Sequence, residues 1–282
     1  MLPLISIGLP VYNGQKYLKR AITNILAQDY KNLELLISDN CSNDTTQEIC
    51  EEFCKLDRRI KYIRQNKNIG GAANYKEVLF KSNGTFFMWH AADDWIEDER
   101  YLSNLYNSMT DAVDFAMPEV KVINEQDKTE NYIFSKFFTE TQEKKEFVLA
   151  ASKHASYQFY SLFKKSKLIE LWPFLWDCKD YKTCWEGMFV TVFNLELRGV
   201  FVKSSTFVYF KNPMGWSSSL PAKEIIKPFT KYALNSFKYI AKTNKLKIFD
   251  KYLILFGFAI QHNVAYIRLC LSIIKHKIIK GI

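Results

Sequence analysis

The 282-residue chain is 48% hydrophobic and 16% aromatic, so it can bury a large core, which excludes a disordered protein. Its net charge of +9 is uneven, because residues 222–282 carry 12 basic and 2 acidic side chains, whereas the remaining residues carry 27 and 28. The near-neutral body argues against a protein that binds nucleic acid. The first residues lack a basic start and a long apolar stretch, so we expect no signal peptide and a cytoplasmic protein.

Apolar runs and amphipathic stretches alternate over the first part of the chain. Strands are expected at residues 4–9, 33–38, 60–63 and 86–89. Helices are expected at about 15–28, 44–55, 72–82 and 98–109. This alternation predicts an α/β fold with a mostly parallel central sheet flanked by helices, because successive parallel strands need a crossover connection.

Three of these expected strands end in polar, turn-like segments, at residues 10–14, 39–44 and 92–95. The carboxyl ends of parallel strands share one edge of a sheet, and ligands of open α/β folds bind there. Four carboxylates can therefore converge: Asp39, Asp44, Asp93 and Asp94. Carboxylate oxygens are the ligands that Mg²⁺ and Mn²⁺ prefer. The structural alternative for the adjacent pair is a solvated turn that caps the next helix.

The second half of the chain shows weaker patterns. Strands are expected at 114–117 and 119–123, and the polar residues 124–146 form either a mobile loop or a plain surface insertion. Beyond Pro221, lysine-rich helices are expected at about 222–243 and 247–279, with an apolar stretch too short to span a bilayer. A basic amphipathic helix suits an anionic membrane surface, although helices packed on the rest of the protein are the alternative.

Four ordered motifs carry a resemblance to a known family. They lie in the segments LPVYNGQKYLKRAITNILAQDY, LELLISDNCSNDT and NKNIGGAANYKEVLFKSNGTFFMWHAADDW. Over residues 3–120 the chain resembles the inverting family 2 glycosyltransferases of the GT-A fold. The resemblance implies a GT-A nucleotide-diphospho-sugar transferase domain over 1–221, with a nucleotide-binding half (1–120) and an acceptor half (121–221), followed by a helical extension (222–282). It also implies that residues 156–166 hold a strand that re-enters the sheet.

The resemblance further implies which residues contact the donor. Three residues would lie beside the nucleotide: Pro10, Tyr12 and Asn13. Three others would pass under it: Asn68, Gly70 and Asn74. Asp39 would accept a hydrogen bond from the base, usually uracil, and an ionised carboxylate suits that role because it only accepts. In the family, an arginine often stands directly before the residue that matches Asn74. Ala73 replaces it here, so one contact to a phosphate or to the base is lost.

Asp93 and Asp94 match the end of the family's metal motif, D-x-D-D, whose first aspartate is replaced here by Ala91. The resemblance implies that these two aspartates hold the donor's ribose and a Mn²⁺ or Mg²⁺ ion. A cation bridging the phosphates stabilises the charge that grows on the leaving nucleoside diphosphate. His90 stands at the end of the preceding strand, where we expect it to be buried without a chemical role.

An inverting transfer needs a general base that deprotonates the acceptor hydroxyl. In the family, an acidic residue about a dozen positions before a Leu-Arg-Gly segment has this role, which points to Glu186 before Leu197–Gly199. Asp177 and Asp180 stay open as alternatives. The structural alternative for Glu186 is an acid in the first turn of a helix at 185–197, complementing the helix dipole.

The sequence thus predicts a metal-dependent inverting hexosyl- or N-acetylhexosaminyl-transferase. It would move a sugar from a UDP-sugar to a saccharide or lipid-linked acceptor in bacterial surface polysaccharide synthesis, at the inner face of the cell membrane. A nucleotidyltransferase is disfavoured because the PVYNG segment lacks the basic, glycine-rich loop that it would need. A non-catalytic nucleotide-sugar- or membrane-binding module is favoured if Ala73 and Ala91 mark a decayed site. Homo-oligomer formation stays open.

Overall fold

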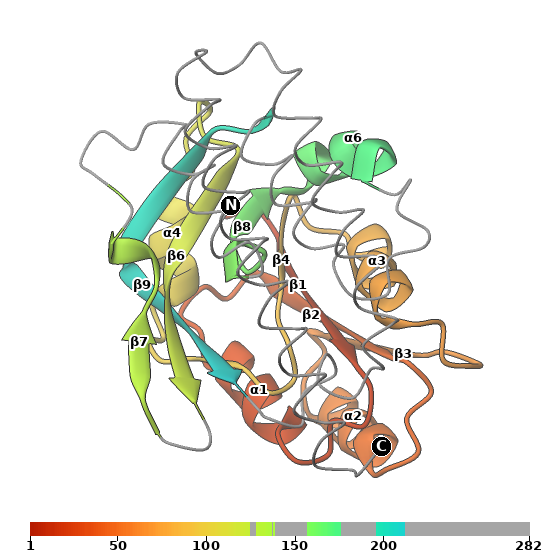
Figure 1. Cartoon of the computed structure of the whole chain (residues 1–282). Helices are drawn as coiled ribbons and strands as arrows, with labels where there is room; N and C mark the ends of the chain where they lie inside the picture. Colours follow the sequence, from red (N-terminus) through yellow and green to blue (C-terminus); the bar gives the residue numbers. More distant parts are fainter. Residues whose placement is uncertain (125–127, 137, 139–156, 176–195, 212–282) are drawn as a thin grey trace, which may run out of the picture.

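Four parallel strands form one half of a mixed sheet in the computed structural model, which describes residues 1–124, 128–136, 138, 157–175 and 196–211 (Figure 1). They are β1 (Ile5–Val11), β2 (Leu33–Asp39), β3 (Ile60–Arg64) and β4 (Phe86–Trp89), in the spatial order β3-β2-β1-β4. The connecting helices are α1 (Leu18–Leu26), α2 (Thr46–Leu56) and α3 (Gly71–Lys81). The expected elements of this half are confirmed, with shifts of one to three residues at several ends.

The central strands are apolar because both of their faces are covered. All seven residues of β1 and all seven of β2 are buried, as is usual for parallel strands with helices on both sides. Gly8 marks a close approach of α3 and β4 to β1, since a Cβ there would lie 2.6 Å from Cζ of Phe87 and 2.7 Å from Cγ2 of Val78. The missing side chain therefore lets α3 pack directly against β1.

The other half of the sheet is mostly antiparallel. After β5 (Trp95–Ile96) and α4 (Tyr101–Asn107) come β6 (Phe115–Asn124), β7 (Glu130–Tyr132), η1 (Phe134–Lys136), β8 (Leu162–Lys164), α6 (Lys165–Leu175) and β9 (Gly199–Lys211). Among the described strands the order continues from β4 as β8-β6-β9-β5, with β7 paired to β6. The strand expected within 156–166 does re-enter the sheet, as β8 between β4 and β6.

The prediction of two separate strands at 114–117 and 119–123 is wrong, because β6 continues through Pro118 as one strand. Its pairing with β9 shifts register between Pro118 and Glu119. A proline cannot donate to a sheet ladder, and such irregularities are where strands accommodate it. The long β9 was not expected from the sequence.

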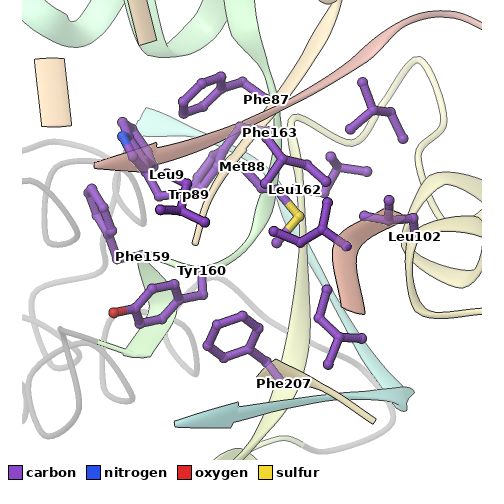
Figure 2. Packing of buried hydrophobic residues seen from close by; sticks show 14 of the residues in the cluster. Leu9, Phe87, Met88, Trp89, Leu102, Phe159, Tyr160, Leu162, Phe163 and Phe207 are labelled. Carbon is purple, nitrogen blue, oxygen red and sulfur yellow. The ribbon is translucent and has the colours of Figure 1, made fainter. Parts of the chain in front are cut away.

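Aromatic rings join the two halves of the sheet (Figure 2). Trp89 of β4 stacks on Phe159 with ring centroids 4.1 Å apart. Phe163 of β8 stacks on Phe115 of β6 at 5.5 Å, and Tyr160 stacks on Phe207 of β9 at 4.5 Å. Offset aromatic pairs add to the free energy of burial, so this cluster fixes the short β8 in place.

Several expectations lie outside the described residues. They include the helix at 185–197 with Glu186, the alternative acids Asp177 and Asp180, and the extension at 222–282. The domain boundary at 221 also stays a prediction. Across the ranges that the structure describes, no helix has the length and hydrophobicity needed to cross a membrane.

Candidate active site

The carboxyl ends of the parallel strands meet at one edge of the sheet, as the sequence predicts. Val11 is in register with Asp39, which is in register with Arg64, and Gly8 is in register with Trp89. The polar segments that follow these strands therefore leave the sheet side by side, with the exit of β1 between those of β2 and β4. This edge is where an open α/β sheet binds its ligand.

The exit of β1 is tied to the loop after β2. Asn13 lies in the left-handed region with φ of 53°, which asparagine tolerates better than most residues. Its backbone N–H donates to Oγ of Ser42 at 2.9 Å, and its Oδ1 accepts the N–H of Asn43 at 3.0 Å. Pro10 is buried within β1, whereas Tyr12 is exposed beside it. Of the three residues expected beside the nucleotide, the side chains of Tyr12 and Asn13 are thus accessible.

Asp44 closes the same loop rather than pointing to a ligand. Its carboxylate accepts the N–H of Thr46 at 3.0 Å and the N–H of Gln15 at 3.1 Å. Burial raises the pKa of this carboxyl group, but the hydrogen bonds from Thr46 and Gln15 outweigh burial and lower it. Asp44 therefore holds the exits of β1 and β2 together.

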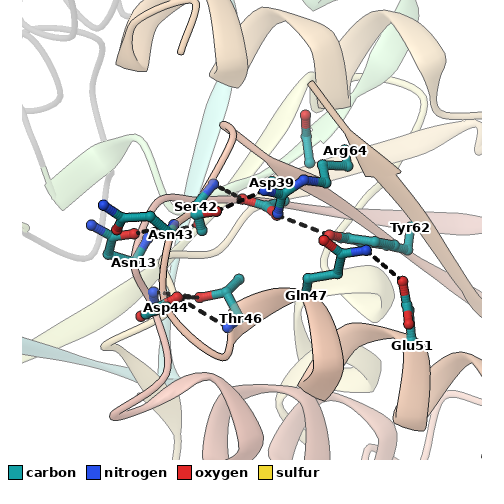
Figure 3. A network of polar contacts seen from close by, with 12 residues as sticks. Asn13, Asp39, Ser42, Asn43, Asp44, Thr46, Gln47, Glu51, Tyr62 and Arg64 are labelled. Atoms are coloured by element: carbon teal, nitrogen blue, oxygen red, sulfur yellow. Dashed lines mark hydrogen bonds and ion pairs between the residues drawn. The ribbon is translucent and has the colours of Figure 1, made fainter. Parts of the chain in front are cut away.

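Asp39 is fully buried at the end of β2 (Figure 3). Its Oδ1 accepts the N–H of Ser42 at 2.8 Å. Its Oδ2 accepts the hydroxyl of Tyr62 at 2.8 Å and Nη1 of Arg64 at 2.7 Å. The burial of Tyr62 and its bond to the carboxylate raise the pKa of its phenol, which stays a donor. That Asp39 also accepts a hydrogen bond from a base stays a prediction.

The segment after β3 is held to the loop after β2 by amide side chains. Asn68 Oδ1 accepts Nδ2 of Asn40 at 2.9 Å and the N–H of Gly70 at 2.9 Å. Gly70 has φ of 84°, a conformation that glycine adopts without strain. Asn74 is buried, and its Nδ2 donates to the carbonyl of Ser38 at 2.8 Å. Asn68 and Gly70 thus shape the edge, whereas Asn74 holds α3 against β2.

The carboxylate pair Asp93–Asp94 follows β4 and lies beside the positively charged side chain of Arg20. Asp94 is fully buried and Asp93 is partly exposed. The guanidinium of Arg20 donates to the carbonyl of Asp93 at 2.7 Å and lies 4.1 Å from the ring centroid of Trp95. Burial raises the pKa of Asp93, and the nearby Arg20 acts in the opposite direction. The turn is thus a held part of the site rather than a solvated helix cap.

The donor set at this turn fits a hard cation only in part. Within the part of the chain that the structure describes, no group of three His, Cys, Asp or Glu residues could hold a metal ion. Asp93 and Asp94 are two hard oxygen donors, and Mg²⁺ is usually held by one or two carboxylates together with substrate phosphates. The residues therefore fit a cation that completes its coordination with a diphosphate.

His90 is fully buried against Phe207, with ring centroids 5.2 Å apart, as expected from its place at the end of β4. Burial lowers the pKa of its imidazole to about 4, so the ring is neutral near neutral pH. Its Nδ1 lies 2.7 Å from the carbonyl of Ala91, which assigns the proton to Nδ1. Among the described residues, no hydrogen-bond partner meets its buried Nε2.

Sequence analysis missed three residues of this edge: Arg20, Tyr62 and Arg64. Arg64 follows the expected strand 60–63 directly, so the rule that strand exits form the site could have included it. Arg20 lies on α1, far from the carboxylates in sequence, and no local pattern marks its contact with Asp93.

Residues 6–172, more than half of the chain, match the family described as Glycosyl transferase family 2. The glycosyltransferase GlyA of Streptococcus pneumoniae is 35% identical over 124 residues, which is 44% of this chain and 18% of GlyA. The GalNAc(5)-diNAcBac-PP-undecaprenol beta-1,3-glucosyltransferase of Campylobacter jejuni is 30% identical over 169 residues, 59% of this chain and 53% of that one. The chain thus spans less than two thirds of these relatives.

Among solved structures, S. aureus TarS 1–349 in complex with UDP-GlcNAc has a TM-score of 0.68 and 18% identity, over 92% of this chain and 72% of that one. A likeness at this identity shows the fold, which confirms the GT-A type of α/β fold. The long match to the family shows more than the fold. The chain belongs to glycosyl transferase family 2.

Proposed function

We propose that this protein transfers a sugar, with inversion, from a UDP-sugar to a saccharide or lipid-linked acceptor. The observation that carries the proposal is the Asp93–Asp94 turn after β4, which shares one sheet edge with Asp39 at the end of β2. Family membership supports the reaction class. The UDP-GlcNAc complex of TarS supports a UDP-sugar, and the undecaprenol-linked substrate in the name of the C. jejuni relative supports a lipid-linked acceptor.

The donor's nucleotide is proposed to lie across the strand exits. Tyr12 and Asn13 would border it at the exit of β1, and Asn68 and Gly70 would border it at the exit of β3. Its base would lie toward the end of β2 and its diphosphate toward the turn after β4. Pro10 and Asn74, which the structure buries, would support this surface from within.

Asp93 and Asp94 are proposed to hold a Mn²⁺ or Mg²⁺ ion together with the donor's phosphates and ribose. When bound, such a cation stabilises the negative charge on the departing diphosphate. Arg20, which donates to the carbonyl of Asp93, would add a positive charge beside the same phosphates. With Ala91 in place of the first acid of the motif, this arginine supports anion binding where one carboxylate is missing.

The transfer itself is a displacement at the anomeric carbon. The acceptor oxygen forms a bond to that carbon as the bond to the diphosphate oxygen breaks, which inverts the configuration. The acceptor's proton passes to a carboxylate, for which we propose Glu186, with Asp177 and Asp180 as the alternatives. The sugar leaves the donor as a glycoside, and the nucleoside diphosphate carries away the bonding electrons.

The test is turnover by the full chain with a panel of UDP-, GDP- and dTDP-sugars, with and without Mn²⁺. We expect a UDP-sugar to be consumed fastest, the metal to be required, and Glu186→Gln to abolish transfer to an added acceptor while preserving donor binding. Asp180→Asn and Asp177→Asn test the two alternative bases in the same way, and both should retain transfer if Glu186 is the base. Release of no nucleotide from any donor, with intact binding, would favour a non-catalytic binding module instead.

We further propose that residues 222–282 bind an anionic membrane surface, because the chain's net positive charge lies there, with 12 basic and only 2 acidic side chains. The full chain should sediment with vesicles containing phosphatidylglycerol and not with neutral phosphatidylcholine vesicles. Equal partitioning into both would contradict this. A peripheral position at the inner face of the cell membrane would bring the site to a lipid-linked acceptor.

A further inference from the structure

Arg64 is the last residue of β3 and joins the loops at the ligand edge (Figure 3). Its Nη1 donates to Oδ2 of Asp39 at 2.7 Å, and its Nη2 donates to the backbone carbonyl of Ser42 at 2.8 Å. The same Ser42 accepts the N–H of Asn13 through its hydroxyl. The guanidinium is thereby fixed in orientation between the exits of β1, β2 and β3.

The guanidinium, and not the carboxylate, is the group that meets the surface. The Asp39 side chain is 0% exposed, whereas the Arg64 side chain is 33% exposed. The carboxylate already accepts three hydrogen bonds from Ser42, Tyr62 and Arg64. A guanidinium has five N–H donors in a planar fork, and Asp39 and Ser42 take one each, so donors remain for a ligand on its exposed side.

We propose that Arg64 contacts the base of the donor nucleotide, and that Asp39 is a positioning residue that acts through it. This inference rests on the proposed function, which places a nucleotide at this edge. The role of Asp39 then differs from the one that the family resemblance implies. Its buried carboxylate fixes the plane of the Arg64 guanidinium and does not itself accept a hydrogen bond from the base. A fixed, charged donor forms a stronger and more directional hydrogen bond than a mobile lysine would.

Such a contact selects among bases by their exocyclic groups. Uracil presents a carbonyl oxygen at position 4, which accepts from a guanidinium, whereas cytosine presents an amino group there, which donates. Two donors facing each other leave a polar group without a partner. Arg64 therefore favours UDP over CDP through the group at position 4; the two bases also differ at N3, which carries a hydrogen only in uracil, so the effect of substitutions at Arg64 on the ratio is what isolates this contact.

Calorimetric titration of UDP and CDP into the full chain, with Mn²⁺ present, tests this. We expect wild-type protein to bind UDP more tightly than CDP by roughly 10- to 100-fold, the worth of one charge-assisted hydrogen bond. Arg64→Gln and Arg64→Lys should each lower that ratio to within about threefold, mainly by weakening UDP. Arg64→Lys keeps the charge, so its effect separates base contact from plain attraction of the phosphates. Arg58→Gln removes an exposed cation from the opposite edge of the sheet and should leave both affinities unchanged.

A double-mutant cycle tests the positioning role of Asp39. If it acts through Arg64, Asp39→Asn should lower the UDP/CDP ratio, and Asp39→Asn combined with Arg64→Gln should bind UDP no more weakly than Arg64→Gln alone. Additive losses would mean that Asp39 contacts the base itself. If the Asp39 variant does not fold, the two Arg64 variants at the partly exposed position still decide the base contact.

The outcomes separate this inference from the proposed function. If wild-type protein binds UDP but the Arg64 variants keep its UDP/CDP affinity ratio, this inference is overturned and the proposed function stands. Wild-type protein that binds neither nucleotide would overturn the proposed function, and this inference with it.

Discussion

Glu34 binds together the end of the sheet opposite the ligand edge, and its removal should destabilise the fold. Its carboxylate, which is 4% exposed, accepts the hydroxyl of Ser6 at 2.6 Å, Nζ of Lys61 at 2.7 Å and the N–H of Asn83 at 2.5 Å. These donors come from β1, β3 and the turn before β4. One side chain on β2 thus links all four parallel strands near their amino ends.

The size of the effect follows from the pKa of Glu34. Burial raises this pKa, but the bonds from Lys61, Ser6 and Asn83 outweigh burial and lower it from 4.5 to about 2. At about 1.4 kcal/mol per unit, the shift corresponds to about 3 kcal/mol. Since half of the Lys61 side chain is exposed, water screens that bond, and about 2 kcal/mol is the expected net contribution.

The sign is that of a depressed acid. The stabilisation is complete above the unfolded pKa of 4.5 and is lost as the pH falls toward 2. Urea unfolding of Glu34→Gln at neutral pH should therefore show a loss of about 2 kcal/mol, with a weaker dependence on acid than wild type. Glu52→Gln is the matched control, because the Glu52 side chain is 59% exposed in a 3.5 Å pair with Lys19. A Glu34 variant as stable as that control would refute the reasoning.

Three further perturbations follow from the packing. Burial lowers the pKa of His90 from 6.5 to about 4, so wild-type protein should lose about 3 kcal/mol of stability as the pH falls from 6.5 to 4, and His90→Gln should not. Urea titrations in which both proteins lose stability equally with falling pH would contradict this. Gly8→Ala forces a Cβ to within 2.6 Å of Phe87 and should cost about 1–3 kcal/mol in thermal unfolding, whereas an unchanged melting temperature would show that the contact can relax. The buried Glu119 accepts backbone N–H groups at the start of η1 at 2.7 Å and 2.8 Å, so Glu119→Gln should speed amide exchange there roughly tenfold; unaltered protection would rule out this clamp.

The sequence predicts the first half of the fold because its signals there are local. Runs such as 33–38 are buried on both faces, and the intervening helices place apolar residues at the spacing of one helix face. The second half depends on distant partners. β9 is a strand because it pairs with β6 and β5, which lie far from it in the sequence. β5 has only two residues, too few to show a hydrophobic periodicity. Pro118 predicted a break between two strands. In the structure, the pairing of β6 with β9 changes register at this proline, and β6 continues as one strand.

The candidate site shows the same division. The positions of Asp39, Asp93 and Asp94 at one edge follow from strand exits alone. Strand exits alone do not predict which groups are exposed at that edge, because exposure depends on side chains that other elements contribute. The pairing of Asp39 with Arg64 comes from the register of β2 with β3, and the contact of Arg20 with the turn after β4 comes from the packing of α1. Roles carried by tertiary contacts have no local pattern in the sequence.

The central claim is that the turn after β4 holds a cation together with a donor's diphosphate. The most direct measurement is the affinity for UDP with and without Mn²⁺, in wild-type protein and in Asp93→Asn and Asp94→Asn. The account predicts that Mn²⁺ tightens UDP binding to the wild type about tenfold or more, and that both variants lose this gain while keeping their metal-free affinity. A gain that survives in both variants would contradict it.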